Sequence, residues 1–412
     1  MSIEKKDTYQ YQIWYLIMSF INFVTVPYEF IFVILITFTI FAFAYIKIKY
    51  PFWNLQPVFH SYDFWRYFYR RPCSIQNATV VNKFYNAFNI KTFKYIECDE
   101  GKIDKFVDFL QCHYIESDRV LVTANKMTYT SYFSGQNMST LISFYHELGI
   151  DTKTPIKGCL TSRAITIYYI DTKVYVYFID YICIHRDVKN KQQIVYELIQ
   201  THQCNQQKKN TNIQISLLKK EGNSILGVIP IVKFNKFLFY LPIIPIISPE
   251  GTSCLPISKT NLNLLLDFID NAQSLFQFVA LADLGNIISL LNNKEIFIYC
   301  FIKQQDVLAF YFFRNAQTQY EDIGDTLEFI GSYNNTKSNN LFLSGFLYAS
   351  NMISKDHSFK LILYENVSHN IVLLDRLLES HSIIIQHECF YYLYNYIIPN
   401  TPLNAYNCFF LF

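Results

Sequence analysis

The feature that most constrains this chain is an uncharged apolar stretch close to its N-terminus. From Phe30 to Ile46 the sequence reads FIFVILITFTIFAFAYI, with Glu29 before it and Lys47 and Lys49 after it. A helix of about 17 to 25 apolar residues can cross the hydrocarbon layer of a bilayer, and this stretch is near the lower limit. The alternative is a buried core helix, but the stretch has no polar face at helical spacing. The pattern favours a membrane-spanning helix over residues 30–46.

Basic residues after this stretch predict the orientation of the span. They are Lys47, Lys49, Arg66, Arg70 and Arg71, and the positive-inside rule then places the large C-terminal part in the cytosol. A cleaved signal peptide is not expected, because the apolar stretch is too long and no small-residue cleavage site follows it. We therefore interpret residues 1–49 as a single-pass membrane anchor.

An earlier apolar run, from Ile13 to Val26, contains Asn22 and ends at Pro27. It is short for a second crossing. The sequence leaves open whether this run crosses the bilayer or lies in the interface.

Composition limits the classes of partner. The 412 residues are 51% hydrophobic and 17% charged, enough for one large core or two smaller ones. The formal net charge of +2 gives no overall basic field, so nucleic acid is not an expected partner. The ten cysteines are scattered without close pairs, which indicates free thiols in a reducing compartment.

Alternation and helical spacing after residue 50 predict an α/β chain with a largely antiparallel sheet. Strands are expected at 80–84, 118–124, 156–170, 173–185, 212–218 and 224–241, and helices at 102–112, 138–148, 192–202, 260–271 and 341–354. The second half adds strands at 296–302, 306–314, 326–333 and 359–365 and a helix at 368–379. This succession predicts two similar units in tandem, residues 50–250 and 251–412, divided near 245–260, where prolines cluster.

Three segments contain residues that could take part in binding or catalysis. Residues 51–58 (PFWNLQPV) follow the apolar stretch, and their aromatic pair is also typical of a membrane-interface anchor. Residues 177–193 form a strand, a basic turn and a helix start, which suits a pyrophosphate but is more often a solvated turn. Residues 391–396 (YYLYNY) precede a wholly apolar chain end, Cys408 to Phe412, which indicates a buried terminal strand.

Together these segments resemble the N-myristoyltransferase family. Residues 52–58 match its FW-x-x-QPV motif, residues 180–192 resemble its NFLCVHKKLRSKR segment, and residues 391–396 match its YYLYNW with Tyr for Trp. Segments at 307–312, 341–350 and 361–367 also resemble the family in order and spacing, so the resemblance spans about 51–412. It implies two acetyltransferase-like (acyl-CoA N-acyltransferase) units with internal pseudo-symmetry, after an N-terminal transmembrane helix.

The resemblance also implies a set of site residues. The terminal carboxylate of Phe412 would be the catalytic base, and the backbone N–H groups of Tyr181 and Ile182 would form the oxyanion hole. Myristoyl-CoA, or another acyl-CoA, would be the co-substrate, with no metal. Its expected binding residues are Phe52, Trp53, Gln56, Pro57, Val58, Cys183, Ile184, Arg186, Lys189, Asn190, Lys191, Gln192, Gln193 and Ile194. The acceptor would be bound by Tyr114, Glu116, Tyr392 and Asn395.

Some positions depart from the family pattern. Residues 216–219 (SLLK) stand where the family has Tyr-Thr-Ala-Gly, which helps to hold the peptide. Residues 113–118 (HYIESD) resemble its NYVEDD loop without the aromatic and basic residues that follow. Asp187 and Gln192 replace expected positive charges. Recognition of the acceptor is therefore the part of the resemblance that the residues support least.

Three functions follow from the sequence. The first is transfer of myristate from myristoyl-CoA to the N-terminal glycine of acceptor proteins, by a monomeric, membrane-anchored enzyme. The second is an N-acyltransferase of the same fold with another acyl chain or amine acceptor. The third is an inactive membrane-anchored binding protein that keeps the fold. The ligand retained by the purified protein would discriminate among them.

Overall fold

The computed structural model describes residues 28–77, 80–117, 119–147, 155–242, 249–320, 323–379 and 381–412. The chain divides into two compact units, and the boundary lies between Leu55 and Gln56. The apolar run 13–26 lies outside the described residues.

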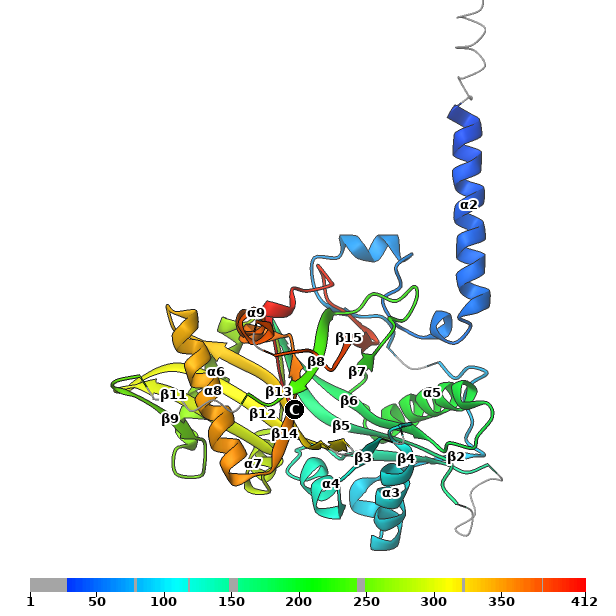
Figure 1. Cartoon of the computed structure of the whole chain (residues 1–412). Coiled ribbons are helices and arrows are strands. Elements are labelled where there is room, and N and C mark those ends of the chain that lie inside the picture. Colours follow the sequence, from blue (N-terminus) through cyan, green and yellow to red (C-terminus); the bar gives the residue numbers. More distant parts are fainter. Residues whose placement is uncertain are drawn as a thin grey trace, which may run out of the picture. The chain divides into compact units, whose positions relative to one another are not determined.

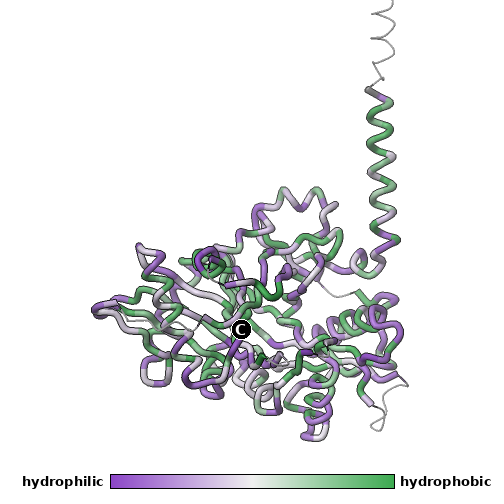
Figure 2. The backbone as a smooth tube through the Cα atoms, in the orientation of Figure 1, coloured by the Kyte–Doolittle hydropathy of each residue, from purple (hydrophilic) through white to green (hydrophobic). Residues whose placement is uncertain are grey.

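The first unit contains one long apolar helix, α2 (Tyr28–Lys49), followed by the 3-10 turn η1 (Trp53–Leu55). Among the described residues, α2 is long and apolar enough to cross a membrane, and its apolar residues are coloured as hydrophobic in Figure 2. None of its apolar window is buried. The Asn54 side chain donates to the carbonyl groups of Ile46 and Tyr50, which caps the end of this helix. The predicted apolar helix is confirmed, and its insertion into a membrane stays a prediction.

The second unit is built on one 15-stranded mixed sheet (Figure 1). Along the sheet the order is β17-β10-β5-β6-β7-β15-β8-β14-β13-β12-β11-β9, with β4 and then β2 branching from β5, and β3 from β12. Neighbours are antiparallel except for the parallel pairs β10 with β17, β6 with β7, and β13 with β14. The predicted α/β class with a largely antiparallel sheet is confirmed.

The strands have the following bounds: β1 Cys73–Ser74, β2 Ile90–Lys94, β3 Val120–Val122, β4 Leu141–Tyr145, β5 Gly158–Tyr169, β6 Thr172–Ile184, β7 Ser216–Glu221, β8 Val232–Tyr240, β9 Thr252–Pro256, β10 Phe278–Ala282, β11 Ile296–Lys303, β12 Asp306–Tyr320, β13 Gly324–Asn334, β14 Phe359–Glu365, β15 Ile385–Tyr394, β16 Tyr396–Ile397 and β17 Cys408–Leu411. The short strands β1 and β16 pair outside the large sheet.

Helices cover the sheet. They are α3 Glu100–His113, α4 Lys126–Phe133, α5 Lys191–Lys209, α6 Leu262–Leu275, α7 Leu284–Asn292, α8 Asn339–Asp356 and α9 Ile371–Leu378, with 3-10 turns η2 Phe64–Phe68, η3 Tyr95–Glu97, η4 Ser368–Asn370 and η5 Ala405–Asn407. Strand β12 shows that both faces of the sheet bury apolar side chains. Its residues Phe310 and Phe312 join one core cluster, whereas Tyr311 and Phe313 join another, because successive side chains of a strand point to opposite faces.

Two predicted elements are wrong. The helix expected at 138–148 is strand β4, which lies between β2 and β5 and has all five residues buried. A short apolar run that is buried on both faces does not distinguish a strand from a helix by its spacing. The strand expected at 80–84 is absent, and the side chain of Asn82 accepts the Phe84 N–H in a turn.

Strands from the two halves of the sequence alternate in the sheet. The late strand β10 pairs with β5, and β15 lies between β7 and β8. The proposed division into units at 50–250 and 251–412 stays a prediction. The sheet itself is continuous across the two halves.

Candidate active site

A cavity of about 660 Å³ opens near the middle of the sheet. We refer to it as the central cavity. Its wall combines the loop before β3, the end of β6, strands β7, β8, β12, β13 and β15, and the chain end. Residues that matter for chemistry there are Tyr114, Glu116, Tyr132, Asp180, Tyr181, Ile182, Lys219, Glu221, Lys236, Glu295, Arg314, Glu328, His387, Tyr391 and Phe412.

A bulge interrupts β6 at the wall of this cavity. Thr161 pairs with Asp180 and Cys159 pairs with Cys183, so Tyr181 and Ile182 together oppose one residue of β5. Tyr181 has a φ of 48°, in the left-handed region. A β-bulge of this kind interrupts the hydrogen bonding between two strands and changes the direction of the backbone groups there. The structure therefore places the two residues of the expected oxyanion hole at an irregular point of the sheet.

Asp180 is a neighbour that sequence reasoning missed. The N–H of Tyr181 donates to Asp180 Oδ1 at 2.8 Å, and the Tyr132 hydroxyl donates to Asp180 Oδ2 at 2.5 Å. The family segment quoted above begins with Asn at this position. Here a carboxylate accepts from the backbone N–H that is expected to serve an oxyanion, and its charge would oppose a negative charge developing there.

Behind Tyr132 lies Arg163, a buried cation. Its guanidinium carbon is 3.8 Å from the centre of the Tyr132 ring, a cation–π contact. Nη1 donates to Asn286 Oδ1 at 2.7 Å, whereas Nε and Nη2 have no hydrogen-bond partner among the described residues. Arg163 is 1% exposed. Tyr132 therefore contacts a buried cation through its ring and a carboxylate through its hydroxyl.

The chain end reaches the same cavity. Strand β17 pairs in parallel with β10, and the Phe412 ring packs against Phe178 with 4.4 Å between ring centres. The terminal residue is 8% exposed. Its main-chain oxygen accepts from Arg314 Nη1 at 3.3 Å, a charge-assisted hydrogen bond. The predicted buried terminal strand is present.

Ion pairs connect the strands that form the wall. Lys219 pairs with Glu365, and Lys236 lies 2.7 Å from Glu328 and 2.9 Å from Glu221. Glu328 also accepts from Arg314, at 2.8 Å from Nε and 2.6 Å from Nη2. Buried charges of this kind need partners. Lys219 belongs to segment 216–219, which departs from the family pattern. It therefore brings a paired ammonium into the cavity.

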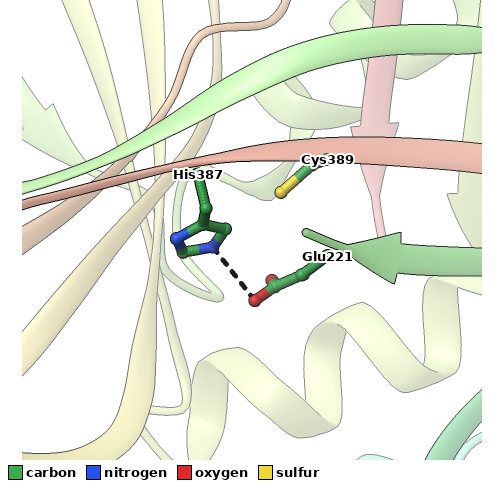
Figure 3. Close-up of side chains that lie close together, drawn as sticks. All are labelled: Glu221, His387 and Cys389. Carbon is green, nitrogen blue, oxygen red and sulfur yellow. Dashed lines mark hydrogen bonds and ion pairs between the residues drawn. The ribbon is translucent and has the colours of Figure 1, made fainter. Parts of the chain in front are cut away.

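At one edge of this network Glu221, His387 and Cys389 lie close together (Figure 3). His387 Nε2 is 3.1 Å from Glu221 Oε2. The nearby Lys236 ammonium lowers the pKa of Glu221, and burial raises the pKa of the Cys389 thiol to about 12. The carboxylate already has a cationic partner in Lys236, so the trio forms one edge of the ion network.

The basic turn after β6 connects residues expected to bind acyl-CoA with the loop expected to bind the acceptor. Lys191 forms an ion pair with Glu116, and Arg186 Nη2 donates to the carbonyl of Ile115 at 2.8 Å. Lys189 and Asn190 are exposed, and the Asn190 side chain does not cap α5. Of the other residues expected here, Cys183, Ile184 and Ile194 are buried, and Gln192 and Gln193 bond to Tyr196 and Glu197 along the helix.

The first and third motifs meet each other away from the central cavity. Gln56 Nε2 donates to Gln200 Oε1 on α5, and the Tyr394 hydroxyl donates to Gln56 Oε1, both at 3.0 Å. The carbonyl of Pro57 accepts the Asn395 N–H, and Val58 forms a bridge with Tyr394. In the other unit, Phe52 and Trp53 make an edge-to-face pair with 5.0 Å between ring centres.

The expected acceptor residues divide into two groups. Tyr114 and Glu116 line the central cavity. Tyr392 instead accepts the Ile225 N–H at 2.9 Å, and the Asn395 side chain bonds to the backbone of Gln76. Tyr391, the neighbour of Tyr392, lines the cavity. Alternation along β15 decides which of the two tyrosines reaches it.

The fold of this chain is that of N-myristoyltransferases. No protein-family model and no curated protein matches the chain. Similar solved structures are crystal structures of Saccharomyces cerevisiae N-myristoyltransferase with bound myristoyl-CoA. One has a TM-score of 0.64 at 12% identity, covering 85% of this chain and 93% of that one, and another has 0.66 at 12%, covering 86% and 91%. A third, with myristoyl-CoA and inhibitors, has 0.67 at 13%, covering 87% and 92%. At this identity the likeness establishes the fold.

Proposed function

We propose that this chain is an acyl-CoA-dependent N-acyltransferase that transfers myristate from myristoyl-CoA to the N-terminal glycine amine of acceptor proteins. The observation that carries the proposal is the meeting of the terminal residue Phe412 and the bulge at Tyr181 and Ile182 in one cavity. The fold shared with structures that contain myristoyl-CoA supports the choice of donor.

The proposed reaction needs few groups from the protein. The acceptor amine attacks the thioester carbonyl, a C–N bond forms, the C–S bond breaks, and coenzyme A leaves as a thiolate that takes the second proton of the amine nitrogen. The carboxylate of Phe412 accepts the proton of the acceptor ammonium before attack. The backbone N–H groups of Tyr181 and Ile182 stabilise the oxyanion. Lys189, Lys191 and the start of α5 hold the coenzyme A phosphates.

Two local features modify this scheme. Asp180 occupies the Tyr181 N–H, so its carboxylate must release that donor before the donor can serve an oxyanion. Lys191 is paired with Glu116, so a phosphate must compete with a carboxylate for this ammonium. Both features affect the efficiency of the reaction more than the identity of its substrates.

A second candidate is an N-acyltransferase with another acyl chain or amine acceptor. The ion pairs of Lys219 and Lys236 support it, because they fill the wall where the resembled family holds its peptide. A third is an inactive acyl-CoA-binding protein of this fold, and the bond from Tyr181 to Asp180 favours it.

Native mass spectrometry of the full chain, purified in detergent, tests these alternatives when it is combined with an assay on glycine-terminated peptides. Retained myristoyl-CoA and an N-myristoylated peptide are the expected results. Another acyl-CoA, or product only with a different amine, supports the second candidate. Retained acyl-CoA with no product on any amine supports the third, and failure to bind any acyl-CoA contradicts the proposal.

A further inference from the structure

A group of aromatic side chains projects from the surface of the second unit, in and just after η2. We name residues 64–71 the aromatic loop. Phe64, Trp65 and Phe68 are 67%, 83% and 76% exposed. Large apolar side chains that gather on a surface indicate an interaction site, because their exposure to water is unfavourable and burial against a partner removes this cost.

The base of the aromatic loop is fixed, so this exposure does not come from a loose chain. The Tyr67 ring packs against Phe59 with 5.1 Å between ring centres, and its hydroxyl donates to the carbonyl of Ser61 at 3.1 Å. The Ser61 N–H donates to the carbonyl of Gly227 in the turn between β7 and β8. Next to Gly227, Leu226 is 47% exposed and adds to the apolar surface.

Positive charge accompanies the aromatic side chains. Arg66 pairs with Asp63 at 3.2 Å, whereas Arg70 and Arg71 are exposed on the outgoing side of the loop. Tryptophan and other aromatic rings concentrate at the headgroup level of bilayers, and exposed arginines are attracted to anionic lipids. This combination is typical of a surface that lies on a membrane.

Along the chain, this loop follows the only described helix that is suited to a bilayer. Helix α2 ends at Lys49, and Phe64 follows 15 residues later (64 − 49). An extended chain of this length reaches at most about 50 Å. If α2 spans a bilayer, the aromatic loop stays within this distance of the surface where α2 emerges. A lipid surface is therefore the partner that the loop meets at high local concentration.

We propose that the aromatic loop is a second membrane contact: Phe64, Trp65 and Phe68 insert into the headgroup region, and Arg70 and Arg71 bind anionic headgroups. The helix then tethers the second unit, and the loop holds it against the bilayer. This inference is independent of the enzymatic activity. It concerns how the folded unit is presented at the membrane.

The test uses the full chain in phosphatidylcholine vesicles with or without phosphatidylserine. The sequence has three tryptophans, and Trp14→Phe with Trp53→Phe leaves Trp65 as the fluorophore. In vesicles with phosphatidylserine we expect Trp65 emission to shift to the blue, phospholipids brominated near the headgroup to quench it, and acrylamide quenching to fall several-fold. Arg70→Gln with Arg71→Gln should remove most of the difference between the two vesicle types.

The same fluorescence measurement on a second variant provides the matched control. Phe88, 75% exposed elsewhere on the second unit, is changed to Trp in a chain that also carries Trp65→Phe, and it should stay accessible to acrylamide. The proposal is overturned if Trp65 is as accessible as this control and brominated lipid does not quench it. Protection from acrylamide without quenching by brominated lipid also overturns it, because a protein partner would then cover the loop.

Discussion

The role proposed for the terminal residue Phe412 depends little on its side chain. Its carboxylate would act as the base, so Phe412→Ala should keep most of the activity. A C-terminal amide, made by semisynthesis, should reduce kcat by about 10²- to 10⁴-fold, the range for loss of a general base. Peptide acylation at saturating acyl-CoA measures both. A fully active amide with unchanged circular dichroism would exclude this role.

Asp180 is the second residue whose charge should control the reaction. Asp180→Asn removes a negative charge next to the Tyr181 N–H, so we expect kcat to rise about tenfold, part of the effect of one oxyanion donor. Asp171→Asn, an exposed change of the same charge in the same hairpin, should leave kcat unaltered. A large fall in kcat for Asp180→Asn with normal acyl-CoA affinity would show instead that Asp180 is the base.

At the scale of elements, the proposed phosphate-binding role of the start of α5 can be tested by removing its positive charges. Lys189→Ala with Lys191→Ala should weaken acyl-CoA binding by about tenfold and reduce its dependence on salt, because two cations near a helix N-terminus favour phosphate. Lys208→Ala with Lys209→Ala, at the other end of the same helix, is the matched control. Isothermal titration measures both, and equal affinities for the two double variants would indicate a solvated turn.

Helix α2 is expected to hold the protein in the bilayer. Its uncharged stretch from Phe30 to Ile46 is long enough to be favoured in hydrocarbon over water, so full-length protein should stay in the membrane pellet in alkaline carbonate. Chain that lacks residues 1–48 should appear in the supernatant. Release of the full-length protein by carbonate would contradict the anchor, even if the shortened chain is soluble.

Strand β4 shows where sequence patterns failed at this scale. Its residues Leu141 to Tyr145 are all buried, so neither a period of two nor a period of 3.6 separates its faces. Helices α3 and α8 were predicted within a few residues of their bounds because each has one buried and one exposed face.

For the whole molecule, two buried histidines predict the effect of pH on stability. Burial lowers the pKa of His202 to about 3 and that of His369 to about 4. His202 lies between Ser143 and Ser162, which bond to its two ring nitrogens at 2.8 and 2.7 Å. In the unfolded chain a histidine has a pKa near 6.5. Between these values the unfolded state binds more protons, so stability falls as the pH falls.

We expect His202 alone to cost about 2 kcal/mol between pH 6.5 and pH 5, since each pH unit is worth about 1.4 kcal/mol for one proton. Urea unfolding of the full chain in detergent measures this, and His202→Gln should show a shallower slope at these pH values. Carboxylates with lowered pKa, such as Glu221, act only at lower pH. An equal slope for the variant and the original chain would contradict a neutral buried His202.

Local sequence determined much of the architecture. In hydrocarbon the uncharged run from Phe30 to Ile46 has to be helical, because a helix satisfies its own backbone hydrogen bonds, and it is helical in the structure. Alternation predicted most strands, and the apolar chain end predicted β17. These features depend on neighbours within a few residues, so they can be recognised without the tertiary structure.

Only the tertiary structure decided the composition of the central cavity. Asp180, Lys219 and Glu328 come from β6, β7 and β13, and their positions in the sequence do not show that they meet in one cavity. Sheet order and the bulge in β6 bring the wall residues among them beside Phe412, across more than 80 residues of chain in each case. Contacts of this range are set by strand pairing and by burial of charge, and the periodicity of a single segment does not contain either.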